Sequence, residues 1–158
     1  MSRLEAEFRR VRSGDAEELA DNLREADAFE LKALGVTDPR SAVRESLAVS
    51  TLSAAVVDQQ GLVALLGVAP LSDSVLTPIG APWMLGVERS RRHVRTLARY
   101  GPAYTRAMLA AYPRLRNIVH ADNALHIGWL QRLGFRFAAE PVVIPSTGAR
   151  FLAFEMSV

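Results

Sequence analysis

The sequence predicts an α/β fold with a mixed central sheet of about six to seven strands, flanked by helices. Three observations support this prediction. Short apolar runs of strand length alternate with stretches of helical periodicity. Their order is one strand, helices, three strands, a helix, a strand, a helix and two strands, which is an α/β layout. A chain of 158 residues is most simply one domain with one core, so we expect residues 1–158 to form a single domain.

Composition narrows the class of protein. Apolar residues make up 49% of the chain and charged residues 23%, as in ordinary globular proteins. No apolar run approaches the ~20 residues that span a bilayer, and the acidic N-terminus lacks the apolar segment of a signal peptide. With no cysteine, the chain has no disulfide framework, thiolate nucleophile or Cys-type zinc site. The three histidines (His93, His120 and His126) are scattered, so we expect no metal site.

The first part of the chain predicts an edge strand and two short helices. Residues 8–12 alternate weakly between apolar and charged side chains. Asp15 and Glu18 have the spacing of a capping box at a helix start. Asp27 and Glu30 repeat that spacing, which indicates that a second helix begins near Asp27.

A third helix and a hairpin should follow. Asp38 offers an N-cap and Pro39 suits the first helical position. Residues 53–57 and 62–69 are apolar runs separated by the polar turn 58–61, which predicts a hairpin of buried strands.

The middle of the chain predicts a loop, a strand and a long helix. The loop covers residues 70–81 and the strand residues 82–87, where Gly86 indicates a bulge or a close backbone approach. The helix covers residues 90–111, with its core face expected at Val94, Leu97 and Ala98. Because proline removes a helical hydrogen bond, Gly101-Pro102 predicts a kink or two abutting helices.

The last third contains the most regular pattern. An apolar run at 115–119 is followed by Asp122 and Asn123, either of which can cap a helix. That helix carries Ile127, Leu130 and Leu133 at three-residue spacing, and Gly134 suits its left-handed end. Residues 135–138 and 151–156 should form the last strands, joined by a loop at 141–148.

The segment from Asn123 to Gly134 resembles the C-terminal motif of the GNAT acyl-CoA N-acyltransferase superfamily. In that family an Asn opens a helix that ends in Leu-Gly-Phe, as in Leu133-Gly134-Phe135 here. A closer resemblance is to GNAT-like internal virion or virion-assembly proteins of short-tailed bacteriophages. The segments that carry it are Asn22-Leu23-Arg24, Pro82-Trp83-Met84-Leu85-Gly86, Tyr112-Pro113 and Trp129-Leu130.

The resemblance implies where acetyl-CoA would bind. In the family, the pantetheine arm pairs with the backbone of the fourth strand, here Leu85 to Val87. The pyrophosphate sits on a glycine-bearing loop at the next helix N-terminus. Here no glycine lies between Gly86 and the helix, so side chains should crowd the loop. Arg91, Arg92 or His93 could still hold the anion; alternatively these residues form a solvated face or pair with N-terminal acids.

The expected catalytic residues are also incomplete. Leu130 takes the place of a Tyr that protonates the departing thiolate in many family members, and it cannot transfer a proton. Glu88 at the end of the fourth strand is the candidate base, although it could equally be a helix cap or a surface charge. Asn123 is expected as a helix cap, with contact to the acceptor as the alternative.

Charge is unevenly distributed along the chain. Residues 1–50 hold eleven of the seventeen acids, whereas residues 89–121 hold eight arginines and no acid. We expect phage virion proteins or a second copy of the chain as partners, an acyl-CoA as a possible ligand, no membrane, and no nucleic acid. The expected function is structural, in virion assembly or inside the particle, and the expected location is the virion or the host cytoplasm. The alternative is an acetyl-CoA-dependent N-acetyltransferase acting on a protein or small-molecule amine.

Overall fold

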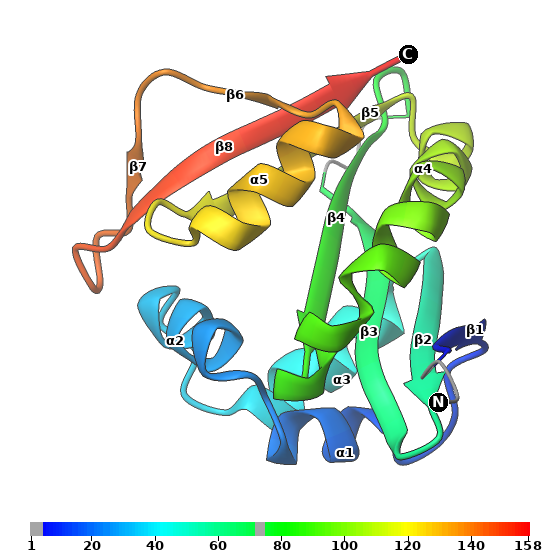
Figure 1. Ribbon diagram of the computed structural model, residues 1–158. Helices are drawn as coiled ribbons and strands as arrows, with labels where there is room; N and C mark the ends of the chain where they lie inside the picture. Colours follow the sequence, from blue (N-terminus) through cyan, green and yellow to red (C-terminus); the bar gives the residue numbers. More distant parts are fainter. Residues whose placement is uncertain (1–4, 72–74) are drawn as a thin grey trace.

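In the computed structural model, which describes residues 5–71 and 75–158, a twisted sheet separates two groups of helices (Figure 1). The strands are β1 (Glu7–Arg9), β2 (Leu52–Asp58), β3 (Gly61–Pro70), β4 (Ile79–Gly86), β5 (Arg114–His120), β6 (Arg136–Phe137), β7 (Val142–Val143) and β8 (Arg150–Ser157). They lie in the order β1-β2-β3-β4-β5-β8-β6, and β7 also pairs with β8. The predicted mixed sheet is confirmed, with eight strands in place of six to seven. The additional strand is β7, which lies in the segment expected as a loop.

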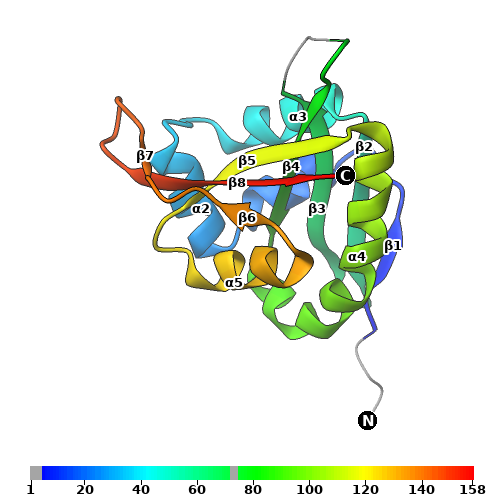
Figure 2. The same cartoon turned by 90° about the horizontal axis from the view of Figure 1, so that it is seen from above.

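The helices cover both faces of this sheet (Figure 2). They are α1 (Asp15–Asp21), α2 (Glu25–Ala33), α3 (Pro39–Val49), α4 (Val94–Ala111) and α5 (Ala124–Leu133), with the 3₁₀ helix η1 (Glu88–His93) leading into α4. Leu19 of α1 and Val43 of α3 pack against β2 and β3 on one face. Met108 of α4 and Leu130 of α5 pack on the other, against a core continued by Phe135.

The strands β4 and β5 separate soon after they meet. They pair in parallel only at Ile79 with Arg114 and at Gly80 with Leu115, whereas every other neighbouring pair is antiparallel. Beyond Gly80 the two ribbons diverge (Figure 1). The sheet therefore contains a split between β4 and β5, and the candidate site lies there.

The ends of α5 confirm the predicted motif. The side chain of Asn123 accepts a hydrogen bond from the backbone of His126 at 3.3 Å. At the other end Gly134 has φ of 100°, its N–H donates to Gln131, and the N–H of Phe135 donates to Leu130. These two bonds form a Schellman motif, which satisfies carbonyls that the helix leaves free.

The first two helix starts differ from their predictions. The N-cap of α1 is Gly14, and Asp15 instead turns its buried carboxylate to the side chain of Arg9 and the N–H of Arg12. The helix α2 begins at Glu25, so Asp27 lies inside it. Asp38 does cap α3, accepting from the N–H of Ser41. The first two capping boxes were wrong because those carboxylates have stronger partners than a first-turn N–H.

The long helix α4 also departs from its predicted face. Its buried positions are Leu97, Gly101, Thr105 and Met108, so Leu97 is confirmed as a core residue. Val94 and Ala98 are exposed, because the stripe that meets the sheet proceeds in steps of about four residues from Leu97. The helix continues through Pro102, so the alternative of two abutting helices is wrong.

Two glycines of the α5 segment should respond oppositely to alanine. Gly134→Ala forces a Cβ into a left-handed conformation and should lower the free energy of unfolding by about 1–2 kcal/mol. Gly128 lies within the helix, and a Cβ there would meet nothing within 4 Å, so Gly128→Ala should raise stability by about 0.5–1 kcal/mol. Urea denaturation of both variants checks the pair; equal shifts would contradict the placement of the helix end.

Candidate functional site

A cavity of about 260 Å³ occupies the split between β4 and β5. Its lining is largely apolar and comes from both faces of the sheet. Leu31 of α2 and Ser46 of α3 line it on one side, and Leu97 of α4 and Leu130 of α5 line it on the other. The cavity therefore passes through the plane of the sheet where the two strands no longer pair.

Three ionisable side chains line this cavity together. Asp27 and Glu30 come from α2, one helical turn apart, and His126 comes from the first turn of α5. One ligand-type atom from each lies within 4.8 Å of the others. Such a cluster could serve as an acid–base group or as a cation site, and its hydrogen bonds decide between these roles.

Glu30 is held by two donors from the far side of the split. Its carboxylate accepts from the backbone N–H of His120 at 2.9 Å and from the side-chain amide of Asn123 at 3.3 Å. Burial raises the pKa of this carboxyl, and the two hydrogen bonds oppose that shift only in part. Glu30 is therefore closer to neutrality than an exposed glutamate.

His126 is neutral and has a defined tautomer. Asn123 uses its carbonyl oxygen to accept from the backbone of His126, so its amide nitrogen faces the ring Nδ1 at 3.3 Å. An amide NH₂ group only donates, so Nδ1 is the acceptor and Nε2 carries the hydrogen. Burial lowers the pKa of His126, which keeps the ring neutral. In this tautomer Asn123 engages the lone pair of the imidazole at Nδ1.

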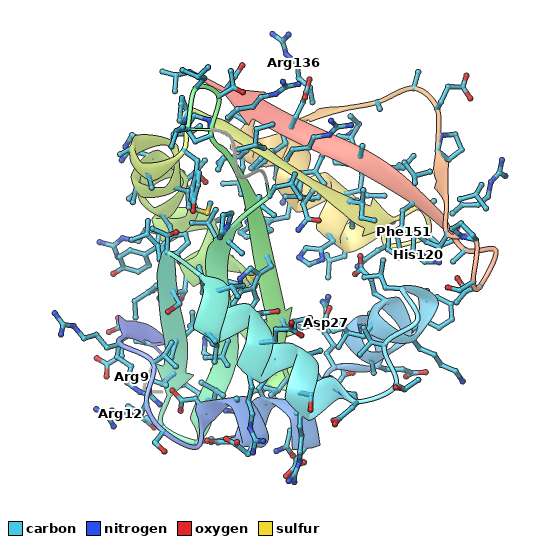
Figure 3. All side chains as sticks on the ribbon, turned by 180° about the vertical axis from the view of Figure 1, so that it is seen from behind. Arg9, Arg12, Asp27, His120, Arg136 and Phe151 are labelled. Carbon is cyan, nitrogen blue, oxygen red and sulfur yellow. The ribbon has the colours of Figure 1, made fainter. Side chains whose placement is uncertain are left out.

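Asp27 connects α2 to the end of β4. One carboxylate oxygen accepts from the N–H of Gly86 at 2.8 Å, and the other accepts from the guanidinium of Arg24 at 2.7 Å. The N–H of Arg24 also donates to the carbonyl of Gly86 at 2.9 Å. Figure 3 shows Asp27 between α2 and the strands. The backbone of Gly86 therefore turns away from β3 and is already paired with the chain's own α2 segment.

The missing side chain of Gly86 leaves room for Ser90 of η1. A Cβ at this position would lie 3.0 Å from Oγ of Ser90 and 3.2 Å from its Cβ, tighter than most real contacts. The predicted close backbone approach at Gly86 is confirmed. The approaching backbone is that of Arg24 at the start of α2, whose N–H donates to the carbonyl of Gly86.

The predicted cofactor residues of the strand occupy different environments. Leu85 lines the cavity, whereas Val87 is 6% exposed and packs with the core on the α1 and α3 face. The N–H of Val87 donates to Val63 of β3, so its donor points away from the split. Of this stretch, Gly86 is the residue whose N–H and C=O both face α2.

The predicted loop residues are divided between the surface and the core. Glu88 accepts from the N–H of Glu25 at 2.7 Å, which makes it a cap for α2. Arg91 and Arg92 are exposed, and Nε of Arg91 lies 3.8 Å from Glu88. His93 is 1% exposed and is held 2.8 Å from the buried carboxylate of Asp58.

Asp58 also holds Arg89, so the loop is tied to the hairpin of β2 and β3. Arg89 bonds to Asp58 at 2.7 and 3.1 Å and to the carbonyl of Leu62 at 3.0 Å. Despite its burial, hydrogen bonds from Arg89 and His93 hold the pKa of Asp58 well below its usual range. Glu88, Arg89 and Arg92 line a second hollow outside the split, so the structure does not bring them to the same place as Asn123.

The acid–base cluster was missed from the sequence. Asp27 and Glu30 were interpreted as a capping box, and His126 as one of three scattered histidines. Their shared face on α2 was visible in the three-residue spacing. The partners of Glu30, His120 and Asn123, lie about ninety positions away and left no local signal.

Comparison with known proteins identifies the fold. No protein-family model matches the chain, and no curated protein matches its sequence. Solved structures do match along nearly the whole length. The spermidine N-acetyltransferase from Vibrio cholerae, in complex with CoA and spermine, has a TM-score of 0.66 at 11% identity, covering 96% of this chain and 95% of that one. NAA60 from Arabidopsis thaliana, in complex with a bisubstrate analogue, has a TM-score of 0.66 at 15% identity, covering 97% and 98%. A GCN5-related N-acetyltransferase from Kribbella flavida has a TM-score of 0.62 at 15% identity, also covering 97% and 98%.

The chain therefore has a GNAT-like α/β fold, as the Asn123-to-Gly134 motif predicted. Nothing in these similarities connects it to bacteriophage virion proteins. Within the described parts of the chain, no helix combines the length and apolar character needed to cross a membrane.

Proposed function

We propose that this chain uses the GNAT fold without the cofactor of the family, as a structural protein that binds other proteins. The bacteriophage resemblance suggests virion assembly or the interior of the particle as its setting. The observation that carries the proposal is the pairing of Gly86 with Arg24 and Asp27. A pantetheine arm that binds as in the family would need this end of the β4 edge.

The strength of that contact decides how weak cofactor binding should be. Arg24 and Asp27 form a buried ion pair, with 8% and 2% of their side chains exposed. Displacing Asp27 and Arg24 from Gly86 would leave buried polar groups unpaired, which costs about 1–3 kcal/mol for each group, or about 4 kcal/mol for two. A cofactor that would otherwise bind at about 1 µM, or about −8 kcal/mol, would then retain about −4 kcal/mol, equivalent to about 1 mM.

Two further features support the loss of cofactor binding. The segment after β4 is a 3₁₀ helix without glycine, and its His93 and Arg89 are committed to Asp58. Leu130, at the position of the family's acid, is 7% exposed and packs in the core. Arg91 and Arg92 remain at the surface as the guanidinium groups that an anion could reach.

Acetyl-CoA should bind with a Kd at or above ~1 mM, or about −4 kcal/mol, when titrated into the wild type by calorimetry. Arg92→Ala tests whether a phosphate contact remains. Arg106→Ala is its control, because Arg106 is an exposed arginine further along α4. Micromolar binding that is lost in Arg92→Ala and kept in Arg106→Ala would overturn the structural role and favour an enzyme.

An N-acyltransferase is the second candidate, and the cluster at the cavity is what favours it. Glu30, with its raised pKa, lies beside a neutral His126 in the split where the family carries out acyl transfer. Turnover of acetyl-CoA with an amine, followed by thiol release, tests this candidate. An enzyme would lose turnover in Glu30→Gln and keep it in Glu140→Gln, whose side chain is exposed.

The partner surface that we propose is the arginine face of η1 and α4, defined as Arg91, Arg95 and Arg99. All three are exposed, and Arg95 and Arg99 form no ion pair with any described residue. Like charges four residues apart repel by a few tenths of a kcal/mol per pair, about 0.2–0.5 kcal/mol. An acidic surface on another subunit or protein would relieve this repulsion.

Arg95→Glu combined with Arg99→Glu should leave the fold intact and weaken self-association or partner association. Sedimentation and circular dichroism measure the two effects. Duplex DNA should bind weakly to both forms, because the small net charge of +2 disfavours a nucleic-acid partner. A gel-shift series at two salt concentrations provides the control: tight wild-type binding that falls steeply with salt would indicate counterion release and reject a protein partner.

A further inference from the structure

We propose that the cavity between β4 and β5 binds a small, uncharged apolar molecule that carries a hydrogen-bond-accepting oxygen, such as an aryl ketone or ester. The side chains that would recognise it are Tyr104 of α4 and Trp129 of α5. This site does not depend on cofactor binding. It requires only the cavity and the two donors that line it.

The size of the cavity sets the size of the ligand. At about 260 Å³ it exceeds the roughly 150 Å³ of an apolar cavity that holds benzene. Its lining includes Phe8, Leu66, Leu97, Met108 and Leu133, which offer apolar contact. Leu34 also lines it and is 37% exposed, so the cavity reaches the surface at the end of α2.

Two buried donors in the lining have no acceptor. Both the hydroxyl of Tyr104 and Nε1 of Trp129 are shielded from solvent, and neither has a hydrogen-bond partner among the described residues. Desolvation raises the pKa of Tyr104 to about 12, so its hydroxyl keeps the proton that it would donate. Because nearly all buried polar groups are hydrogen-bonded, two orphaned donors in one lining indicate an acceptor that the chain does not supply.

The other tryptophan shows the contrast. Trp83 also lines the cavity, but its Nε1 donates to Oγ of Ser50 at 2.9 Å. The chain has two tryptophans, and each carries one indole N–H donor. The donor of Trp83 is satisfied, whereas that of Trp129 has no partner among the described residues. Among the two indole donors of the cavity lining, the one without a partner therefore belongs to the wall formed by α4 and α5.

The crossing of α4 and α5 places the two donors on that wall. Gly101 of α4 lets α5 approach, since a Cβ there would lie 3.0 Å from Cδ2 of Leu133, with the Trp129 ring next at 3.7 Å. Tyr104 follows Gly101 by about one helical turn. His126 stacks on Trp129 with ring centroids 5.9 Å apart, which fixes the indole.

The charges around the cavity disfavour an anionic ligand. Asp27 and Glu30 line its α2 side, so an anionic carboxylate would meet two acidic groups. The carboxylate of Asp27 is already occupied by Arg24 and Gly86. A ketone or ester oxygen can accept from Tyr104 or Trp129 without adding charge.

Indanone and indane are a matched pair of probes, since they share a bicyclic shape and differ in one carbonyl. Heteronuclear NMR resolves the indole N–H of Trp129 from that of Trp83, and Trp129→Phe assigns the two. Indanone is expected to move the Trp129 indole resonance with a submillimolar Kd, and indane to bind at least fivefold more weakly. Leu130→Phe, which adds volume to the lining, should abolish binding of both.

Tyr104→Phe removes one donor and keeps the ring. It should weaken the binding of indanone at least fivefold and leave the affinity for indane unchanged. Tyr100→Phe, at an exposed tyrosine, is the control and should change neither. No indanone shift at millimolar concentration would mean that water satisfies the donors, and would overturn the proposal. Equal affinity for indanone and indane would also overturn it, as would competition by micromolar acetyl-CoA.

Discussion

Phe135→Ala is expected to lower the free energy of unfolding by about 3–5 kcal/mol, a large share of the stability of a domain of this size. Phe135 is 5% exposed and meets Phe154 of β8 edge-on, with ring centroids 5.2 Å apart. It belongs to the core cluster that holds α5 against β5 and β8. Removing this side chain leaves a cavity between α5, β5 and β8. The backbone hydrogen bond from Phe135 to Leu130 holds the end of α5 in position.

Chemical denaturation measures this loss, and Phe29→Ala provides the comparison. Phe29 is 58% exposed, so its removal should cost well under half as much as that of Phe135. A Phe135→Ala midpoint within error of the wild type would show that the end of α5 has been placed wrongly.

Asp27→Ala is expected to cost about 3–5 kcal/mol, because it leaves the buried guanidinium of Arg24 without its counter-charge. It also leaves the N–H of Gly86 without an acceptor. Asp21→Ala is the matched control, since it breaks an ion pair to Arg40 in which both side chains are about half exposed, and should cost about 0–1 kcal/mol. Equal losses in the two variants would contradict a buried contact between α2 and β4.

Features set by neighbouring residues could be predicted from the sequence. The cap at Asn123, the left-handed Gly134 and the return of Phe135 depend on residues within one helix and its next turn. The hairpin of β2 and β3 likewise depends on two apolar runs and the turn between them. Local hydrogen bonds and periodicity were sufficient for these elements.

Features set by distant partners could not be predicted. A carboxylate three residues before another acid suits a capping box, but Asp15 and Asp27 both accept from donors that the fold brings to them. The strand β7 is two residues long and exists through its pairing with β8. No local pattern distinguishes such a strand from a loop.

The candidate site was predictable in position but not in composition. The resemblance pointed to the end of β4, where Leu85 lines the cavity; Asn123 does not line it but donates to Glu30, which does. His93 was proposed as an anion ligand because it follows arginines in the loop, yet its ring lies in the core beside Asp58. The contact of His120 with Phe29 and Phe151 likewise depends on the packing of α2 against β5 and β8 (Figure 3).

The amide resonance of Gly86, followed by NMR during a titration with acetyl-CoA, tests the central claim most directly. The claim is that α2 occupies the end of the β4 edge through Arg24 and Asp27. It predicts that the Gly86 amide is protected from hydrogen exchange and does not shift at cofactor concentrations below about 1 mM. A Gly86 amide that shifts at micromolar acetyl-CoA and loses its protection from exchange would show that α2 yields the edge to the cofactor, and would contradict the account.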